Sequence, residues 1–496
     1  GTVTITPAGG NAIKGISPLD VKIRDGQPVT GDTMQVAVQA AEKYSFTGGK
    51  IVALAQVEHK DKTVDAYQHV TEFTGASTTY TIPKFGAYTE SGDTVTVEIT
   101  VYADFTYQEP QADITVNVGD GSITGNDTSG VTKSGNTIRI DTAALNGKVV
   151  KITGEMIGTS SNQVIIASST RNVEASRRAD IILDNVIMLP VTGTTKENYK
   201  TYLRGSLASS VSVSVSYEGN TSRQSNSSKN VGAPIAIADA DVHMTLTGSN
   251  ILSNNSSYYD SGLANQSAIM VDASASLIIT DKSTGNLFAQ GGGCSAAIGS
   301  SGEQPSGFVE IDGGTIQTYS AFSEHSYAGI GNGGHYSSTD PGTRGFVMNG
   351  GDVEAIGFHY GIGGNGGQSM TSGSYDSGIG RQYINITGGT LLCESSAGSQ
   401  GATLGWAYNN DEHVVRIGRI GDSDNDLSVT AVNWGYGAAI SGRMNFYSGT
   451  TAAYSGEYAA AIGGNGLSNA VVARPSETNA QQGTSAITGT QLCVYG

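Results

Sequence analysis

Apolar and polar residues alternate in short runs over the first 110 residues. This period of two places successive side chains on opposite faces of a β-strand. Turn sequences such as Ser91-Gly92-Asp93 and Thr47-Gly48-Gly49 separate the runs. We therefore predict a small Ig-like β-sandwich over residues 1–110, ending at Glu109-Pro110-Gln111 because proline cannot continue a central ladder. The predicted strands are Val3–Ile5, Met34–Val38, Lys50–Val57, Thr79–Ile82 and Thr94–Tyr102.

Between residues 111 and 265 the alternating runs shorten to three to five residues, with Gly, Asn, Ser and Thr frequent between them. Strands this short do not suit a sandwich, but they suit the coils of a parallel β-helix, in which each coil adds one rung to every face. We predict that 111–265 forms the N-terminal coils of such a helix. The predicted strands are Thr137–Ile140, Val149–Ile152, Val164–Ile166 and Ile181–Leu183.

A repeat follows over residues 266–496. Its unit is two small residues, an aliphatic anchor and usually glycine, as in Ala328-Gly329-Ile330-Gly331. Companion strands such as Phe346–Asp352 end in a tight Gly-Gly turn. The anchors are 22 to 42 residues apart, which indicates constant rungs with variable loops and predicts an all-β fold, a right-handed parallel β-helix. The anchors are Ile269, Ile298, Ile330, Ile362, Leu404, Ile440 and Ile462. We also expect each end to be capped, the second by a strand over Ser485–Tyr495.

The repeat resembles the glycine-rich β-helix repeats of large secreted or wall-attached proteins of Gram-positive gut bacteria. The resemblance covers about 265–465 and is carried by "AAIG", "VEIDGGT", "FVMNGGD", "INITGGT" and "AAIGGNG". It implies a surface protein of adhesin-like or carbohydrate-binding character. It implies no single activity, because the fold hosts hydrolases, lyases and adhesins alike.

Composition and charge exclude some classes of binding partner and indicate a cellular location. The net charge of −17 has the wrong sign for a nucleic-acid binder, and no apolar stretch is long enough to span a membrane. Three widely separated cysteines exclude a disulfide framework and favour small core residues. An acidic chain with 69 glycines, also rich in Ser, Thr and Asn, is typical of an exported bacterial protein, so we expect an extracellular or cell-wall location.

Candidate chemistry gathers in three long loops between rungs, where a β-helix carries its function. Asp340, Asp376 and Asp411 recur about one coil apart, so they are the candidate acid and base groups of a glycoside hydrolase or polysaccharide lyase. The alternative is that these aspartates are solvent-facing turn residues. Aromatic and basic neighbours are candidates for contact with sugar rings: His335, Tyr336, His359, Tyr360, Arg381, Trp406 and Tyr408.

The sequence lacks the adjacent Asp-Asp and the Gly-His-Gly of β-helix hydrolases. The leading prediction is therefore a carbohydrate-engaging adhesin or binding scaffold whose partners are glycans or glycoproteins. A catalytic role and a filament or sheath subunit remain alternatives. No cofactor is required, but Asp422, Asp424 and Asp426 alternate on a turn and could offer oxygens to Ca²⁺, although the EF-hand pattern fails at Leu427 and Asn433.

Overall fold

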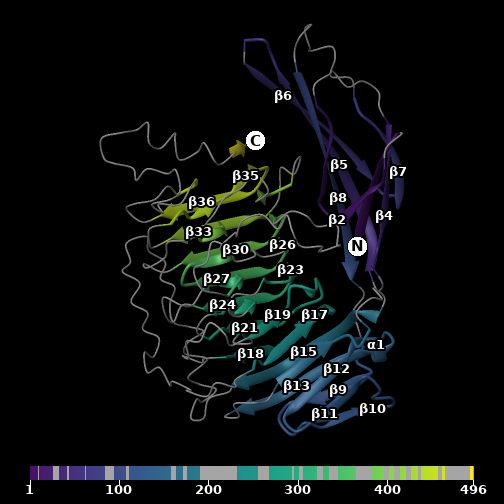
Figure 1. The fold of residues 1–496 in the computed structure, drawn as a ribbon, viewed down its shortest axis with the longest axis vertical. Coiled ribbons are helices and arrows are strands. Elements are labelled where there is room, and N and C mark those ends of the chain that lie inside the picture. Colours follow the sequence, from purple (N-terminus) through teal and green to yellow (C-terminus); the bar gives the residue numbers. More distant parts are fainter. Residues whose placement is uncertain are drawn as a thin grey trace. The chain divides into compact units, whose positions relative to one another are not determined.

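The structure is a computed structural model in which the chain divides into two compact units (Figure 1). The first is Gly1–Glu109, and the second consists of the described residues from Pro110 onward. The structure describes residues 1–8, 11–25, 33–41, 44–61, 63–83, 94–107, 111–157, 163–170, 176–189, 232–254, 267–292, 295–300, 305–320, 328–333, 345–364, 383–395, 402–406, 414–419, 426–433, 437–455, 461–463 and 492–494.

Two antiparallel four-stranded sheets make up the first unit. One contains, in spatial order, β2 (Ile13–Ile16), β1 (Thr2–Pro7), β4 (Thr33–Gln39) and β7 (Ser77–Thr81). The other contains β3 (Leu19–Asp25), β8 (Thr94–Tyr107), β5 (Tyr44–Glu58) and β6 (Val64–Phe73). The alternate residues of both sheets meet in one core, for example Val3 and Val36 from one and Ile51 and Val97 from the other.

The predicted turn at Thr47-Gly48-Gly49 is wrong, because β5 runs straight through it with a bulge between Phe46 and Gly48. A side chain on Gly49 would collide with the Tyr102 carbonyl and the Phe73 ring, so this glycine allows close packing within a strand. The prediction also missed β2, β3 and β6. Strand β6 is mostly exposed and its residues do not alternate in burial, which removed the signal.

The second unit contains three ladders of parallel strands. The first ladder holds β9 (Ile114–Asn117), β13 (Val149–Ile157), β15 (Arg178–Leu189), β17 (Asp241–Thr247), β20 (Ser276–Ile279), β23 (Phe308–Ile311), β26 (Gly345–Met348), β29 (Tyr383–Ile386), β32 (Val414–Ile417), β35 (Arg443–Phe446) and β37 (Leu492–Val494). The second ladder holds β18 (Ser249–Ser253), β21 (Asn286–Gln290), β24 (Thr315–Ser320), β27 (Asp352–Gly357), β30 (Thr390–Ser395), β33 (Ser428–Asn433) and β36 (Thr450–Ser455).

A ten-stranded sheet forms the third ladder. It holds β11 (Val131–Ser134), β12 (Thr137–Asp141), β14 (Gln163–Ala167), β16 (Ile235–Ala238), β19 (Ile269–Val271), β22 (Ile298–Gly299), β25 (Ala328–Gly331), β28 (Tyr360–Gly364), β31 (Leu404–Trp406) and β34 (Ile440–Ser441). From β16 to β36 the chain visits the third, first and second ladders in turn. The register of the third ladder runs unbroken from β16 to β19, across residue 265.

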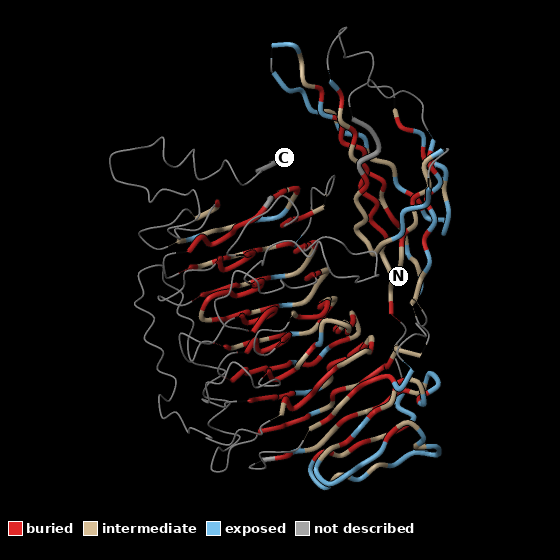
Figure 2. The backbone as a smooth tube through the Cα atoms, in the orientation of Figure 1, coloured by how far each residue is buried: buried red, intermediate tan, exposed pale blue. Residues whose placement is uncertain are grey.

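The predicted anchors pair with one another along the third ladder, which confirms their assignment as equivalent rung positions. Ile269 pairs with Ile298, and the series continues through Ile330, Ile362 and Leu404 to Ile440, which bridges to Ile462. Those from Ile269 to Ile440 are at most 1% exposed. They lie in one core with side chains from the other two ladders. Figure 2 shows that the strands of these ladders are coloured mostly as buried.

Glycine follows most anchors for a steric reason. Gly299, Gly331, Gly363 and Gly405 form a column in register, and their φ angles lie between 127° and 137°, which L-residues with side chains rarely adopt. A Cβ on Gly363 would collide with the carbonyl oxygen of Gly405 on the next rung. The backbones of adjacent rungs approach too closely for a side chain at Gly299, Gly363 and Gly405, whereas Met270 and Ser441 occupy the two ends of the same column.

Strands β13 and β15 are longer than the predicted three to five residues, because each passes around a corner and serves two ladders. The corners lie at Gly154 (φ 98°) and Asn185 (φ 54°). In later rungs a turn divides the same path into two strands, as at Gly313-Gly314 and Gly350-Gly351. The predicted Gly-Gly turns are confirmed, with φ of 80° at Gly314 and 82° at Gly351.

Antiparallel hairpins close the N-terminal end of the stack. Strand β10 (Ile123–Gly125) pairs with β9, and β11 pairs with β12. The short helix α1 (Thr142–Leu145) follows β12 and begins after Asp141, whose side chain accepts a hydrogen bond from the Ala143 amide. Near the other end, β37 lies within the predicted C-terminal strand and pairs in parallel with β35. No helix in the described part of the chain is long and apolar enough to cross a membrane.

Shortening an anchor tests the stack. Ile330→Ala should lower the free energy of unfolding by about 2–5 kcal/mol, because it removes a fully buried side chain and leaves a cavity between Ile298 and Ile362. Thr315→Ala, at an exposed position of the second ladder, should change it by less than about 0.5 kcal/mol. Urea unfolding of both variants gives the comparison, and equal stabilities would contradict the anchor role.

Candidate functional site

Most of the residues predicted to carry chemistry lie outside the described residues. The structure therefore leaves their roles as predictions. They are Asp340, Asp376, Asp411, His335, Tyr336, Arg381, Tyr408, Asp422 and Asp424. The structure places the remaining four: His359, Tyr360, Trp406 and Asp426.

The aromatic candidates among these four are core residues rather than loop residues. Trp406 is 0% exposed at the end of β31, where its ring belongs to the central hydrophobic core. Tyr360 is 1% exposed and His359 is 7% exposed. Stacking on a sugar requires an accessible ring face, so the predicted sugar contacts of Trp406 and Tyr360 need correction. These rings pack the interior and the adjoining corner, where His359 also contacts the Phe358 ring edge-on at 4.8 Å.

Asp426 is exposed just before β33. Within the described residues, no group of three or more His, Cys, Asp or Glu side chains is placed to hold a metal ion. A calcium site at 422–426 thus stays a prediction that rests on the sequence alone.

A row of polar side chains stands on the outer side of the first ladder. Alternation in β23 sends Val309 and Ile311 into the core, so Glu310 between them faces away from it. The same position on later rungs holds Val347, Asn385 and Arg416. The residues that directly follow β23, β26 and β29 form a second column, which consists of Asp312, Asn349 and Thr387. We call these polar residues the polar face: Glu310, Asp312, Asn349, Asn385, Thr387 and Arg416.

Hydrogen bonds join the polar face from rung to rung. Asn349 Nδ2 donates both to Glu310 Oε1 at 3.0 Å and to Asp312 Oδ1 at 2.8 Å on the preceding rung. On the following rung, Thr387 Oγ1 donates to Asn349 Oδ1 at 2.7 Å. Asn349 is therefore held from both sides, which fixes the positions of the two carboxyl groups that it bridges.

The two carboxyl groups also hydrogen-bond each other, and both pKa values are raised. Burial raises the pKa of Glu310. Burial and then the negative charge of Glu310 raise the pKa of Asp312 well above its usual range. Neighbouring carboxylates in a desolvated site resist simultaneous ionisation, which is the physical reason that both pKa values are raised.

Tyr383, at the start of β29, completes this region. Its ring lies against Gly345 on the preceding rung, and its centroid is 6.4 Å from that of Phe308 on the rung before. The side chain thus leans back toward the rung of Glu310. Burial, and then the charge of Glu310, raise the pKa of its hydroxyl. On the far side, Arg416 Nη1 donates to Asn385 Oδ1 at 3.2 Å.

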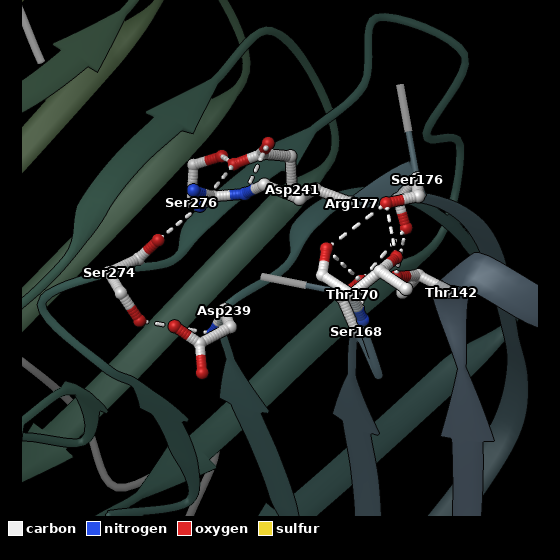
Figure 3. Close-up of polar contacts among 9 residues, drawn as sticks. All are labelled: Thr142, Ser168, Thr170, Ser176, Arg177, Asp239, Asp241, Ser274 and Ser276. Atoms are coloured by element: carbon white, nitrogen blue, oxygen red, sulfur yellow. Dashed lines mark hydrogen bonds and ion pairs between the residues drawn. The ribbon is translucent and has the colours of Figure 1, made fainter. Parts of the chain in front are cut away.

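A second polar cluster lies in the N-terminal part of the second unit, beside the starts of β15 and β17 (Figure 3). Arg177 pairs with Asp241 at 3.3 Å and also donates to the Ser274 carbonyl, and Ser276 Oγ donates to Asp241 at 2.6 Å. Nearby, Ser176 accepts a hydrogen bond from Thr142 at its carbonyl oxygen. These ion pairs and hydrogen bonds connect successive rungs to one another, so the cluster is a structural feature of the fold rather than a ligand site.

Comparison with known proteins found no matching family model, no matching curated protein and no matching solved structure.

The sequence contains a signal for the polar face beyond the turn that its repeats define. The signal lies in "VEIDGGT", "FVMNGGD" and "INITGGT". Superposing the repeats and reading their outward positions gives Glu310 and Asp312, then Asn349, then Asn385 and Thr387. The contact between the carboxyl groups and Asn349 needed the rung-to-rung register as well.

The raised pKa values of Glu310 and Asp312 make stability depend on pH. For an acid whose pKa is raised by folding, the native state binds more protons than the unfolded chain above the unfolded pKa of about 4, so stability falls as pH rises through the raised pKa. Asp312→Asn removes one member of the pair. Its stability relative to the parent should be higher at pH 8 than at pH 4, as measured by thermal unfolding in matched buffers.

A suitable control is Asp352→Asn, which removes an exposed carboxylate from the second ladder. Its stability difference from the parent should show little change between the two pH values. A difference between Asp312→Asn and the parent that is the same at pH 4 and pH 8 would contradict the raised pKa of Asp312.

Proposed function

We propose that the second unit is a right-handed parallel β-helix preceded by an Ig-like sandwich. The repeated visiting order of the three ladders supports this architecture, as does the single core that they share. Each rung buries its apolar side chains mainly against its neighbours, which produces a rigid stack with side chains at fixed intervals of about 4.8 Å.

We further propose that the protein is a carbohydrate-engaging binding scaffold of the bacterial cell surface or exterior. The observation that carries this proposal is the part of the polar face on two successive rungs, where the carboxyl groups of Glu310 and Asp312 and the amide of Asn349 are joined by hydrogen bonds. Asn385, Thr387 and Arg416, on the next two rungs, are buried and hold this arrangement from behind. Sugar hydroxyl groups both donate and accept hydrogen bonds, so they suit such a mixture. Glu310, Asp312 and Asn349 are partly exposed and thus accessible to a ligand.

The geometry favours binding over hydrolysis at this face. Glycosidases place a sugar, or a sugar and a water, between two carboxyl groups that are roughly 5–9.5 Å apart. Glu310 and Asp312 instead interact directly and share the Asn349 amide as a common hydrogen-bond donor, which is a different arrangement from two carboxyl groups on either side of a sugar. Catalysis by Asp340, Asp376 and Asp411, and assembly into a filament, remain alternative hypotheses.

A glycan array tests the proposed function. The parent protein should bind a subset of glycans, and Asn349→Ala should weaken that binding by about tenfold, because hydrogen bonds that involve charged groups contribute about 1.5–3 kcal/mol. Thr315→Ala, on the second ladder, should bind as the parent does. Thermal unfolding of each variant would establish that it is folded. Absence of binding by the parent would remove the proposal, and equal binding by Asn349→Ala would remove its assignment to the polar face.

A further inference from the structure

A cavity lies at the N-terminal end of the second unit, where strands β9 to β13 come together (Figure 1). The register of the strands explains why it is there. The pairing of β13 with β9 ends at Thr153, because the chain then turns back into β10, whereas the pairing of β13 with β15 continues to the end of β13. The interior of the stack is open beside this last part of β13. The cavity has a volume of about 90 Å³, measured as the space open to the centres of water molecules.

Apolar side chains form the floor of this cavity. All are core residues that are at most 8% exposed, and they come from five different segments: Val118, Ile138, Met156, Val164 and Met188. Met156 and Met188 stand in register on adjacent rungs. Water against this floor meets no hydrogen-bonding side chain, so a ligand that displaces the water with an apolar group gains affinity. The flexible thioethers of the two methionines adapt readily to such a group.

Polar side chains stand at the mouth of the cavity. Asp120, Lys133 and Asn136 are exposed, and Gln163 is half-buried. Lys133 Nζ donates a hydrogen bond to the Asp120 carbonyl oxygen at 2.9 Å, which joins the β9–β10 turn to β11. The Gln163 amide lies close to Gly232, where a Cβ would come within 2.9 Å of Gln163 Nε2. These contacts fix two sides of the mouth.

The lining favours a neutral ligand that is apolar at one end. Its ionisable side chains are one carboxylate, Asp120, and one ammonium group, Lys133, so their charges balance. The carboxamides of Asn136 and Gln163 can each donate and accept hydrogen bonds. An amide with a methyl group on its carbonyl carbon matches this arrangement, with the amide at the mouth and the methyl on the floor. Since one water needs about 10–15 Å³ of such space, the cavity has room for a group of this size.

We propose that this cavity is a binding subsite for an acetamido group, and that its ligand is a glycan with N-acetylated amino sugars. The methyl group packs on Met156 and Met188, and the amide N–H and C=O form hydrogen bonds with the carboxamides of Asn136 and Gln163. The glycan nature of the ligand rests on the proposed function. The site itself is separate from the polar face, because β15 lies three rungs before the rung of Glu310.

Two probes of equal length isolate the acetyl group: the trisaccharide of N-acetylglucosamine and its fully de-N-acetylated counterpart. Titration calorimetry of the folded parent should show the N-acetylated form binding at least about tenfold more tightly, because it buries a methyl group and adds an amide hydrogen bond.

Methyl NMR of protein labelled at its methionine methyl groups locates the site. The N-acetylated trisaccharide should shift the signals of Met156 and Met188, which the variants Met156→Leu and Met188→Leu assign. The signal of Met348, fully buried in the core of a later rung, should not move.

Variants connect the preference to the cavity. Gln163→Ala removes one carboxamide from the mouth and should weaken binding of the N-acetylated trisaccharide about fivefold. Gln317→Ala makes the same change on the second ladder, so it should bind as the parent does. Val118→Phe places a larger side chain in the cavity and should abolish the preference for the acetylated form. Thermal unfolding establishes that each variant is folded, and Gln163→Ala carries the test alone if Val118→Phe does not fold.

The outcomes separate this inference from the proposed function. Equal affinity for the two trisaccharides, or preference for the free amine, would overturn the acetamido subsite and leave glycan binding intact. Binding of the N-acetylated form that leaves the Met156 and Met188 signals unmoved, or that Gln163→Ala does not weaken, would overturn its location. Absence of binding by both trisaccharides would overturn the inference as well, and the proposed function then fails only if the glycan array is also empty.

Discussion

Vertical contact between like positions on adjacent rungs is the constraint on which the second unit depends. Aliphatic anchors pack one above another in the third ladder, and the glycine that follows most anchors lets the backbones of adjacent rungs approach closely. These requirements recur along the ladder, so the sequence repeats where the chain returns to that position. The connections between rungs face no such requirement, and their lengths vary.

The same vertical register creates the polar face. A strand that sends alternate residues into the core must send the others outward, and stacking then aligns the outward residues of successive rungs. Asn349 illustrates the result, since it reaches Glu310 and Asp312 on one side and Thr387 on the other. Residues 35 to 40 positions apart in the chain become direct neighbours, and a cluster of interacting groups forms from one position per repeat.

These relations explain how far the sequence could be interpreted. The anchors and the Gly-Gly turns were predictable because each rests on a local rule that a repeat displays many times. Strand β6 was not predicted, because most of its residues are exposed and they do not alternate in burial. The continuation of β5 through Gly48 was not predicted, because the glycines at its bulge are also typical of a turn. Trp406 was assigned to a loop because of its residue type and its neighbours, but register with Gly364 places it in the core. The carboxyl pair was missed because its partner Asn349 lies one rung away.

The corner at Asn185 shows what the register permits in the evolution of such a chain. Here the part of β15 that pairs with β13 contains one residue more than β13, and the extra residue, Asn185, lies at the bend between two ladders, with φ of 54°. Its side chain is used on the next rung, where Oδ1 accepts a hydrogen bond from the Ser249 amide. A single insertion within a strand would instead exchange the inward and outward faces of every later residue in that strand. The register of each ladder therefore determines which residues of a strand face the core and which face outward. Single residues can be inserted or deleted at corners and in loops without exchanging these two sets.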